Sequence, residues 1–217
     1  TGYTVVNATV QSTKSGGPIA AAWALLRALG DAGYLELARR TLEASRKIVA
    51  GVAAVPGLRV LGTPEMSLVA FTAEGGAPAA FAIVDAMKAR GWLVQPLLQG
   101  RGSPTNLHLT ISAGHLAVAD RFLADLRAAA EEARTQPADP GLALLLQAAA
   151  SMDFTALSAE SFTQALALVG VRDGQLPTRM AGINALLDAL PPAGREAALI
   201  TFVNDLYAAH VPTTSGA

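Results

Sequence analysis

The chain is organised around the stretch Thr9-Val10-Gln11-Ser12-Thr13-Lys14-Ser15-Gly16-Gly17-Pro18, which runs directly into the apolar segment Ile19–Leu26. Proline is tolerated in the first turn of a helix, so this junction predicts a helix N-terminus near Pro18. Hydroxyls, glycine N–H groups and one ammonium beside that N-terminus favour an anion such as a phosphate or a carboxylate. The alternative interpretation is a polar loop that caps a buried helix, with Ser15 as its N-cap.

The composition indicates a folded chain with few charges. Its 217 residues, 52% of them hydrophobic, suffice for one large domain or two small ones. Only 15% are charged and the formal net charge is −1, so we expect no nucleic-acid partner. Although the mean hydropathy is +0.37, Gly, Pro, Asp or Arg interrupts every apolar run, and we expect no membrane span. The sequence begins with neither a signal peptide nor a Met, which predicts a portion of a longer protein.

Residues that usually bind metals are sparse. The chain has no cysteine, which excludes disulfides and thiolate chemistry and favours the cytoplasm as its compartment. The three histidines, His108, His115 and His210, are scattered and form no H-E-x-x-H motif. We therefore expect no metal centre.

Hydrophobic periodicity predicts a small α/β lobe in the middle of the chain. We expect helices over about 18–29, 31–52, 77–90 and 114–134, and strands over about 58–60, 66–71, 92–94 and 107–111. After the two opening helices the order is β-β-α-β-β-α, which describes a mostly antiparallel sheet covered by helices. In the third helix the spacing places Phe81, Val84 and Met87 inward and Asp85 and Lys88 outward.

A helical extension follows the lobe. The clearest linker is Thr135–Gly141, which contains two prolines and a glycine. Beyond it the sequence predicts helices over 142–150, 158–169, 178–190 and 193–209. We expect this extension to cover the small lobe or to serve in assembly.

Several short motifs, in the same order, resemble the group II pyridoxal-phosphate-dependent decarboxylases, and most closely their sphingosine-1-phosphate lyase-like branch. The resemblance covers residues 1 to about 134 and stops before the helical extension. The motifs are Thr9–Gly17 before an Ala-Ala-Trp helix, Gly33-Tyr34-Leu35, Pro56–Gly62, Pro64–Phe71, Met87–Trp92, and Leu109-Thr110 leading to Val118–Leu123.

This resemblance implies a fold-type-I pyridoxal-phosphate enzyme that is active as a homodimer, with a large cofactor domain and a small C-terminal domain. Residues 1–54 would be the end of the large domain and its linking helices. Residues 55–136 would be the small α/β domain, and residues 137–217 a helical C-terminal extension. The activity implied is that of a carbon–carbon lyase, either an amino-acid decarboxylase or a phosphosphingoid-type aldehyde lyase.

The family holds pyridoxal phosphate as a Schiff base on a lysine that follows a histidine. The lysines of this chain are Lys14, Lys47 and Lys88, and none follows a histidine. Lys14 matches a position where the lyases carry an arginine after Gly-Ser. The resemblance therefore implies that the catalytic lysine lies outside this chain, which by itself would be inactive.

The same resemblance implies the site residues. Ser12, Thr13, Gly16 and Gly17 would contact the cofactor, and Lys14 and Arg101 would bind the substrate, an amino acid or a phosphorylated amino alcohol. Lysine is a point charge and lacks the bidentate fork of arginine, which leaves the substrate class open.

Other prominent side chains have structural interpretations. The sequence favours core or domain-interface packing for Trp23 and Trp92, a solvated position near a helix N-cap for His115, and a surface position for His108. A different reading of the whole chain is a non-catalytic dimerisation or binding module whose helical tail recruits a partner.

Overall fold

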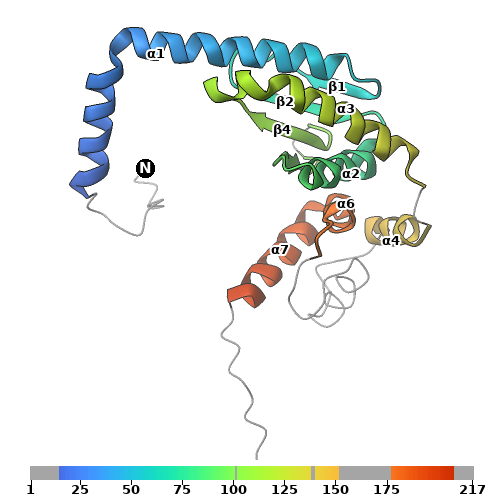
Figure 1. Cartoon of the computed structure of the whole chain (residues 1–217). Coiled ribbons are helices and arrows are strands. Elements are labelled where there is room, and N and C mark those ends of the chain that lie inside the picture. The colour runs from blue at the N-terminus through green and yellow to red at the C-terminus, as the bar shows by residue number, and fades with distance from the viewer. Residues whose placement is uncertain (1–14, 101, 138–139, 152–176, 208–217) are drawn as a thin grey trace, which may run out of the picture.

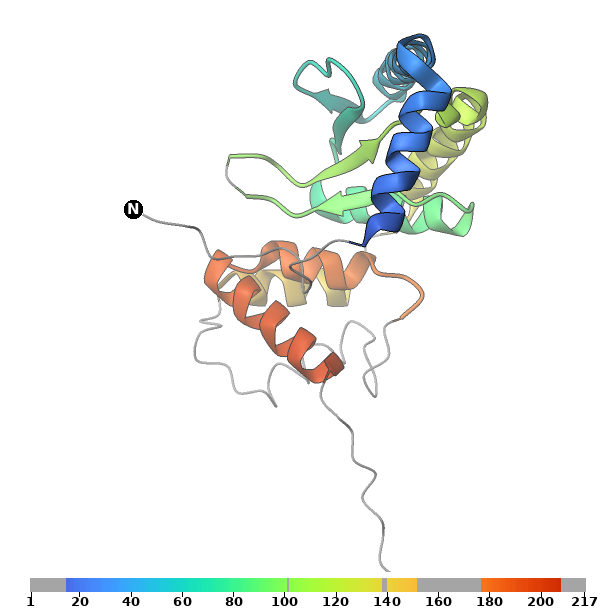
Figure 2. The ribbon, with the colours of Figure 1, turned by 90° about the vertical axis from the view of Figure 1, so that its left-hand side faces the viewer.

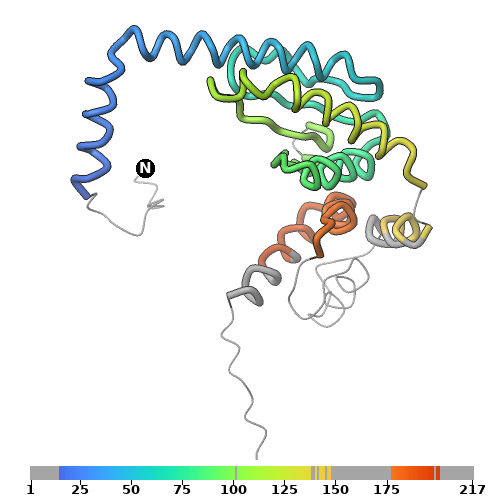
Figure 3. Tube along the Cα trace, viewed as in Figure 1, coloured from blue at the N-terminus to red at the C-terminus, as the bar shows by residue number. Residues whose placement is uncertain are grey.

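A computed structural model describes residues 15–100, 102–137, 140–151 and 177–207. It opens with helix α1 (Gly16–Ala53), which is interrupted at Gly30, where φ is 57° and ψ is −174°. Glycine reaches this conformation without steric cost, and the predicted helix end at Gly30 is confirmed. The tube in Figure 3 turns sharply within α1, so that its first half projects away from the rest of the molecule.

The predicted antiparallel sheet is confirmed, with four strands in the order β1-β2-β4-β3. Strands β1 (Leu58–Leu61) and β2 (Leu68–Ala73) pair with each other, and β4 (Asn106–Thr110) lies between β2 and β3 (Gln95–Leu97). Pro96 is accommodated because β3 is an edge strand.

Helices cover one face of this sheet (Figure 2). They are the second half of α1, α2 (Gly76–Ala89) and α3 (Ala119–Thr135), which follows the 3-10 helix η1 (Ala113–Val118). The core lies between sheet and helices, with Phe71, Leu107, Met87 and Leu126 fully buried. His108 alternates with buried Leu107 and Leu109 and is half-buried on the opposite face, as its spacing predicts.

Two local predictions are wrong. Residues 92–94 form no strand, because the N–H of Trp92 donates to Met87 O at 3.0 Å and continues the turn that ends α2. In the second half of α1, the spacing of Leu35, Ala38, Leu42, Ser45 and Val49 predicts one buried stripe, and this stripe is buried only toward its end. Ser45 and Ile48 lie in the core, whereas Leu35 is 70% exposed because the helix extends past the sheet.

The C-terminal helices pack beside the α/β lobe (Figure 1). They are α4 (Pro140–Ser151), α6 (Ala181–Ala189) and α7 (Pro192–Tyr207). Helix α6 packs on α2, and its residues Ile183 and Leu186 are buried together with Leu190, which follows the helix. The helix predicted over 158–169 lies outside the described residues. No described helix combines the length and the hydropathy that a membrane span requires.

Candidate cofactor and substrate site

The two candidate glycines, Gly16 and Gly17, form the first turn of α1 and are exposed. Among the described residues, no side chain or remote backbone atom comes within 4 Å of where a Cβ would stand on either glycine. Ser15 is the N-cap by position, in extended conformation, but its side chain makes no capping hydrogen bond. Within the described residues, this helix start therefore has open space beside the N–H groups of its first turn, which suits an anion. Ser12, Thr13 and Lys14 lie outside the described residues, as does Arg101.

The first half of α1 presents apolar side chains to solvent. Ile19, Trp23 and Leu26 are 63%, 65% and 57% exposed, and Arg27 is the one charged residue between Pro18 and Gly30. A helix that is apolar on most sides is normally buried against other protein. Trp23 is thus not a core residue of this chain. Trp92 is half-buried and packs against the core, in line with the packing role that its sequence context predicts.

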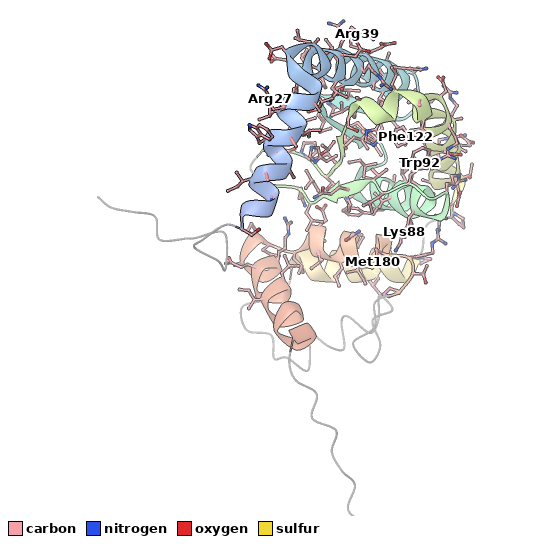
Figure 4. The ribbon with its side chains drawn as sticks, turned by 60° about the vertical axis from the view of Figure 1, so that its left-hand side comes forward. Arg27, Arg39, Lys88, Trp92, Phe122 and Met180 are labelled. Carbon is pink, nitrogen blue, oxygen red and sulfur yellow. The ribbon has the colours of Figure 1, made fainter. Side chains whose placement is uncertain are left out.

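Trp92 is fixed by three neighbours on α3. Its Nε1–H donates to Asp125 Oδ2 at 2.7 Å, its ring meets Phe122 edge-on with centroids 5.3 Å apart, and the Arg121 guanidinium lies 4.6 Å from its ring centre. Figure 4 shows Trp92 and Phe122 side by side. These contacts give Trp92 a packing role between α2 and α3.

Neither described lysine is placed to carry a cofactor. Lys47 Nζ of α1 pairs with Asp120 Oδ2 of α3 at 2.7 Å, and exposed Lys88 Nζ donates to Thr178 O at 3.4 Å. A lysine that forms a Schiff base is usually desolvated or placed beside another cation. The described residues therefore do not fit covalent attachment of pyridoxal phosphate.

The two described histidines have local roles. The N–H of Ser112 donates to His115 Nδ1 at 2.8 Å, so His115 takes part in capping η1, as expected for its position. His108 and His115 both line a cavity of about 360 Å³, whose walls also include Ile48 of α1, Gln95 of β3 and Phe122 of α3. Neither Gly16 nor Gly17 lines this cavity. No group of side chains in the described ranges is suited to hold a metal ion.

Resolved pKa shifts fall on exposed helix pairs. The hydrogen bond from Arg39 lowers the pKa of Glu36, and the same bond raises the pKa of Arg39. The pair of Glu131 and Arg134 on α3 behaves alike: hydrogen bonding lowers the pKa of the carboxyl and raises that of the guanidinium. Both pairs have i,i+3 spacing on a helix surface, which is the ordinary structural use of such residues.

Two buried carboxylates that sequence reasoning did not single out join the lobe to the C-terminal helices. Asp85 of α2, expected to point outward, is 7% exposed and accepts the N–H groups of Met180 and Ala181, both at 2.9 Å. The outward expectation is wrong because α6 covers that side of α2. Helix α6 also begins at Ala181, later than predicted, where this carboxylate caps it.

The second carboxylate, Asp188 of α6, is 4% exposed and bonds to the turn between β3 and β4. The sequence signal that could have identified Asp85 is an acidic residue within a mostly apolar helix. Asp188 gives the same signal, but its partners lie more than eighty positions away, and no local pattern in the sequence indicates them.

Comparison with known proteins places this architecture among pyridoxal-dependent enzymes. Residues 140–205 match a family model described as "Pyridoxal-dependent enzyme, C-terminal putative HTH domain". The chain is 35% identical over 149 residues to the sphingosine-1-phosphate lyase of Arabidopsis thaliana, covering 68% of this chain and 26% of that protein. It is 29% identical over 91 residues to a "Probable L-aspartate decarboxylase" of Thermococcus gammatolerans, covering 42% and 23%.

A solved structure supports the same relation. The sphingosine-1-phosphate lyase of Burkholderia pseudomallei K96243 matches with a TM-score of 0.51 and 33% identity, over 76% of this chain and 32% of that one. The chain belongs to the group II pyridoxal-phosphate-dependent decarboxylase family. Within it, the sphingosine-1-phosphate lyases are the relatives that it matches over most of its length. It spans about a quarter of the length of the curated relatives it matches.

Proposed function

We propose that this chain is the C-terminal portion of a pyridoxal-phosphate-dependent carbon–carbon lyase of fold type I. Residues 1–54 would complete the large cofactor domain, residues 55–136 would form the small domain, and residues 137–217 would form a helical extension. The observation that carries the proposal is the 33–35% identity to sphingosine-1-phosphate lyases, one of them a solved structure that covers 76% of the chain. The exposed apolar half of α1 supports it, because such a helix needs further protein to cover it.

In the complete enzyme, pyridoxal phosphate would act as the electron sink when a bond to the substrate's Cα breaks. We propose that Ser12, Thr13, Gly16 and Gly17 contact the cofactor and that Lys14 and Arg101 bind the anionic groups of the substrate. The N-terminal turn of α1 supports this assignment, since the N–H groups at a helix start suit an anion and the described residues leave space there. A homodimer and a cytoplasmic location belong to the same proposal.

We further propose that the cofactor's lysine is supplied from outside residues 1–217. The test is to mix the chain with pyridoxal phosphate, reduce with borohydride and locate the label by mass spectrometry. We expect only weak labelling, spread over Lys14, Lys47 and Lys88. Stoichiometric labelling of Lys14, lost in Lys14→Arg and retained in Lys47→Arg, would contradict the proposal.

Activity is tested on the protein encoded by the longest open reading frame that contains this chain. Release of CO₂ from amino acids identifies a decarboxylase, and release of an aldehyde from a phosphorylated amino alcohol identifies an aldehyde lyase. Lys14→Ala should lower kcat/KM roughly 10- to 1000-fold, the scale of one lost charge-assisted contact. Lys47→Ala, on the helix surface, is the matched control. An unchanged rate in Lys14→Ala would leave the stretch Thr9–Pro18 as a capping loop, and absence of both activities would favour a non-catalytic module.

The family model that matches residues 140–205 describes a "putative HTH domain", where HTH stands for helix-turn-helix, and many helix-turn-helix domains bind DNA. The charges of this segment do not favour binding to nucleic acid. It contains three arginines against six acidic residues. Nucleic-acid surfaces are rich in lysine and arginine that can reach phosphates. Arg195 is already engaged with backbone carbonyls. We therefore propose a small-molecule substrate and no nucleic-acid partner.

A further inference from the structure

The carboxylate of Asp188 bonds to both ends of the turn that joins β3 to β4. Oδ1 accepts the N–H of Gln99 at 2.6 Å, and Oδ2 accepts the hydroxyl of Thr105 at 2.7 Å. Thr105 is itself tied to the sheet, because the hydroxyl of Thr72 donates to its carbonyl at 2.7 Å. We call α4, α6 and α7 together the C-terminal helical unit. One side chain of this unit therefore sets the separation between the two ends of the turn.

Arg195 of α7 reinforces the same contact. Its Nη1 donates to Gln99 O at 2.7 Å, while Nε and Nη2 donate to Leu187 O at 2.9 Å and Asp188 O at 3.0 Å. The guanidinium thus caps the last carbonyls of α6 and bonds to the turn as well. Gln99 returns a bond from its side-chain amide to Asp188 O at 2.9 Å.

These bonds form a specific anchor. A buried carboxylate is costly unless donors satisfy it, so Asp188 is stable there only while Gln99 and Thr105 stay in place. Beyond them, the turn is closed by two backbone bonds between Gly100 and Ser103, at 3.0 and 2.9 Å. So short a turn at the end of a three-residue edge strand needs outside support to hold one conformation.

We propose that the C-terminal helical unit fixes the conformation of the β3–β4 turn, with Asp188 and Arg195 as positioning residues. The anchor itself rests on the contacts above. The effect of the anchor on substrate binding rests on the proposed function, in which this turn contacts the substrate. The helical unit would then set substrate affinity from outside the site, without touching the reacting atoms.

The anchor is tested on the 217-residue chain by hydrogen exchange. Asp188→Ala should raise exchange in the peptide of residues 95–106 roughly tenfold or more, and leave the β2 peptide of residues 68–73 unchanged. Glu196→Ala, an exposed acid on α7, is the matched control and should change neither peptide. Unchanged exchange in residues 95–106, or an equal rise in both peptides, would overturn the anchor.

Two milder variants keep the test valid if Asp188→Ala does not fold. Asp188→Asn retains an acceptor for Gln99 N–H and gains a donor for the Thr105 hydroxyl, so its exchange should rise less. Thr105→Val removes the hydrogen bond from the Thr105 hydroxyl to Asp188 Oδ2 without altering the helical unit. This variant should also raise hydrogen exchange in residues 95–106. If neither variant raises exchange there, the anchor is overturned.

The effect of the anchor on substrate binding is tested separately, on the active enzyme encoded by the longer reading frame. Asp188→Asn should raise KM at least threefold with kcat within about twofold, since a displaced turn weakens ground-state and transition-state binding together. A fall in kcat at constant KM would indicate loss of folded enzyme and would overturn the positioning role. If the reading frame has no lyase activity, the proposed function fails, and the exchange result still decides the anchor.

Discussion

Asp85 caps a helix whose N-cap residue, Met180, lies ninety-five positions further along the chain: its Oδ1 accepts the N–H of Met180 at 2.9 Å. Its Oδ2 accepts the N–H of Ala181 at the same distance. The free N–H groups at the start of α6 thus find their acceptor on α2, and the positive end of the helix lies against a buried carboxylate. Figure 4 shows Met180 next to Lys88, at the boundary between α6 and α2.

Replacing Asp85 should detach the start of α6. Asp85→Ala leaves two helix N–H groups without acceptors, and we expect the free energy of unfolding to fall by about 1–2 kcal/mol, as for loss of a helix cap. Chemical denaturation measures the change, and hydrogen exchange should locate it in α6. Asp85→Asn should lose less, since one oxygen remains. Glu74→Ala, an exposed acid near the start of α2, is the control; an equal effect there would contradict the capping role.

Helix α2 shows how far the sequence predicts this fold. The inward positions of Phe81, Val84 and Met87 follow from spacing alone, because the sheet forms the first layer of the core. Asp85 is assigned to solvent by the same spacing, which has no information on a second layer. That layer, α6, comes from a segment nearly a hundred residues away. Local periodicity predicts elements and one core face, whereas packing between distant segments leaves no periodic signal.

Ser45 should be replaceable at no cost. Its hydroxyl is buried in α1 and has no hydrogen-bond partner among the residues that the structure describes. A buried hydroxyl without a partner lowers stability, and alanine is the better helix former. We therefore expect Ser45→Ala to leave unchanged or to raise the free energy of unfolding, by up to about 1 kcal/mol. Thermal and chemical unfolding measure this; a loss of more than about 1 kcal/mol would show that the hydroxyl has a partner.

Gly51 allows α1 and α3 to approach each other. A Cβ at this position would stand 2.3 Å from Cδ1 and 2.5 Å from Cδ2 of Leu123. These atoms are the free end of a half-buried side chain that can shift, so Gly51→Ala should lower the free energy of unfolding by no more than about 1 kcal/mol, the lower end of the usual cost of overpacking. Leu123→Ala in the same chain should relieve the clash, so that the two changes are not additive. Gly17→Ala, with open space around its Cβ, should cost nothing; additivity of Gly51→Ala and Leu123→Ala would contradict this packing.

The candidate site is predicted less completely than the fold. The motif order correctly predicts the family, because several short matches together are specific where each alone is not. The roles of Ser12, Thr13, Lys14 and Arg101 remain predictions, since they lie outside the described residues. Asp188 and Arg195 show the physical limit. They act on a turn that lies 83 to 96 positions earlier in the chain, through bonds that no spacing rule encodes.

Gly30 sets the direction of the exposed half of α1, and its replacement should straighten the helix. Its φ of 57° with ψ of −174° costs an alanine about 1–3 kcal/mol, whereas helical φ and ψ cost it nothing. Because the chain has no cysteine, spin labels can be attached at Arg27→Cys and Arg46→Cys, one in each half of α1. In a straight helix these positions are about 28 Å apart along the axis, and the break shortens that distance. We expect Gly30→Ala to move the distance measured by electron–electron double resonance toward this value. Ala32→Ser, an exposed change beside the break, should leave it unaltered. An unaltered distance in Gly30→Ala would mean that contacts other than the glycine conformation fix the angle between the two halves.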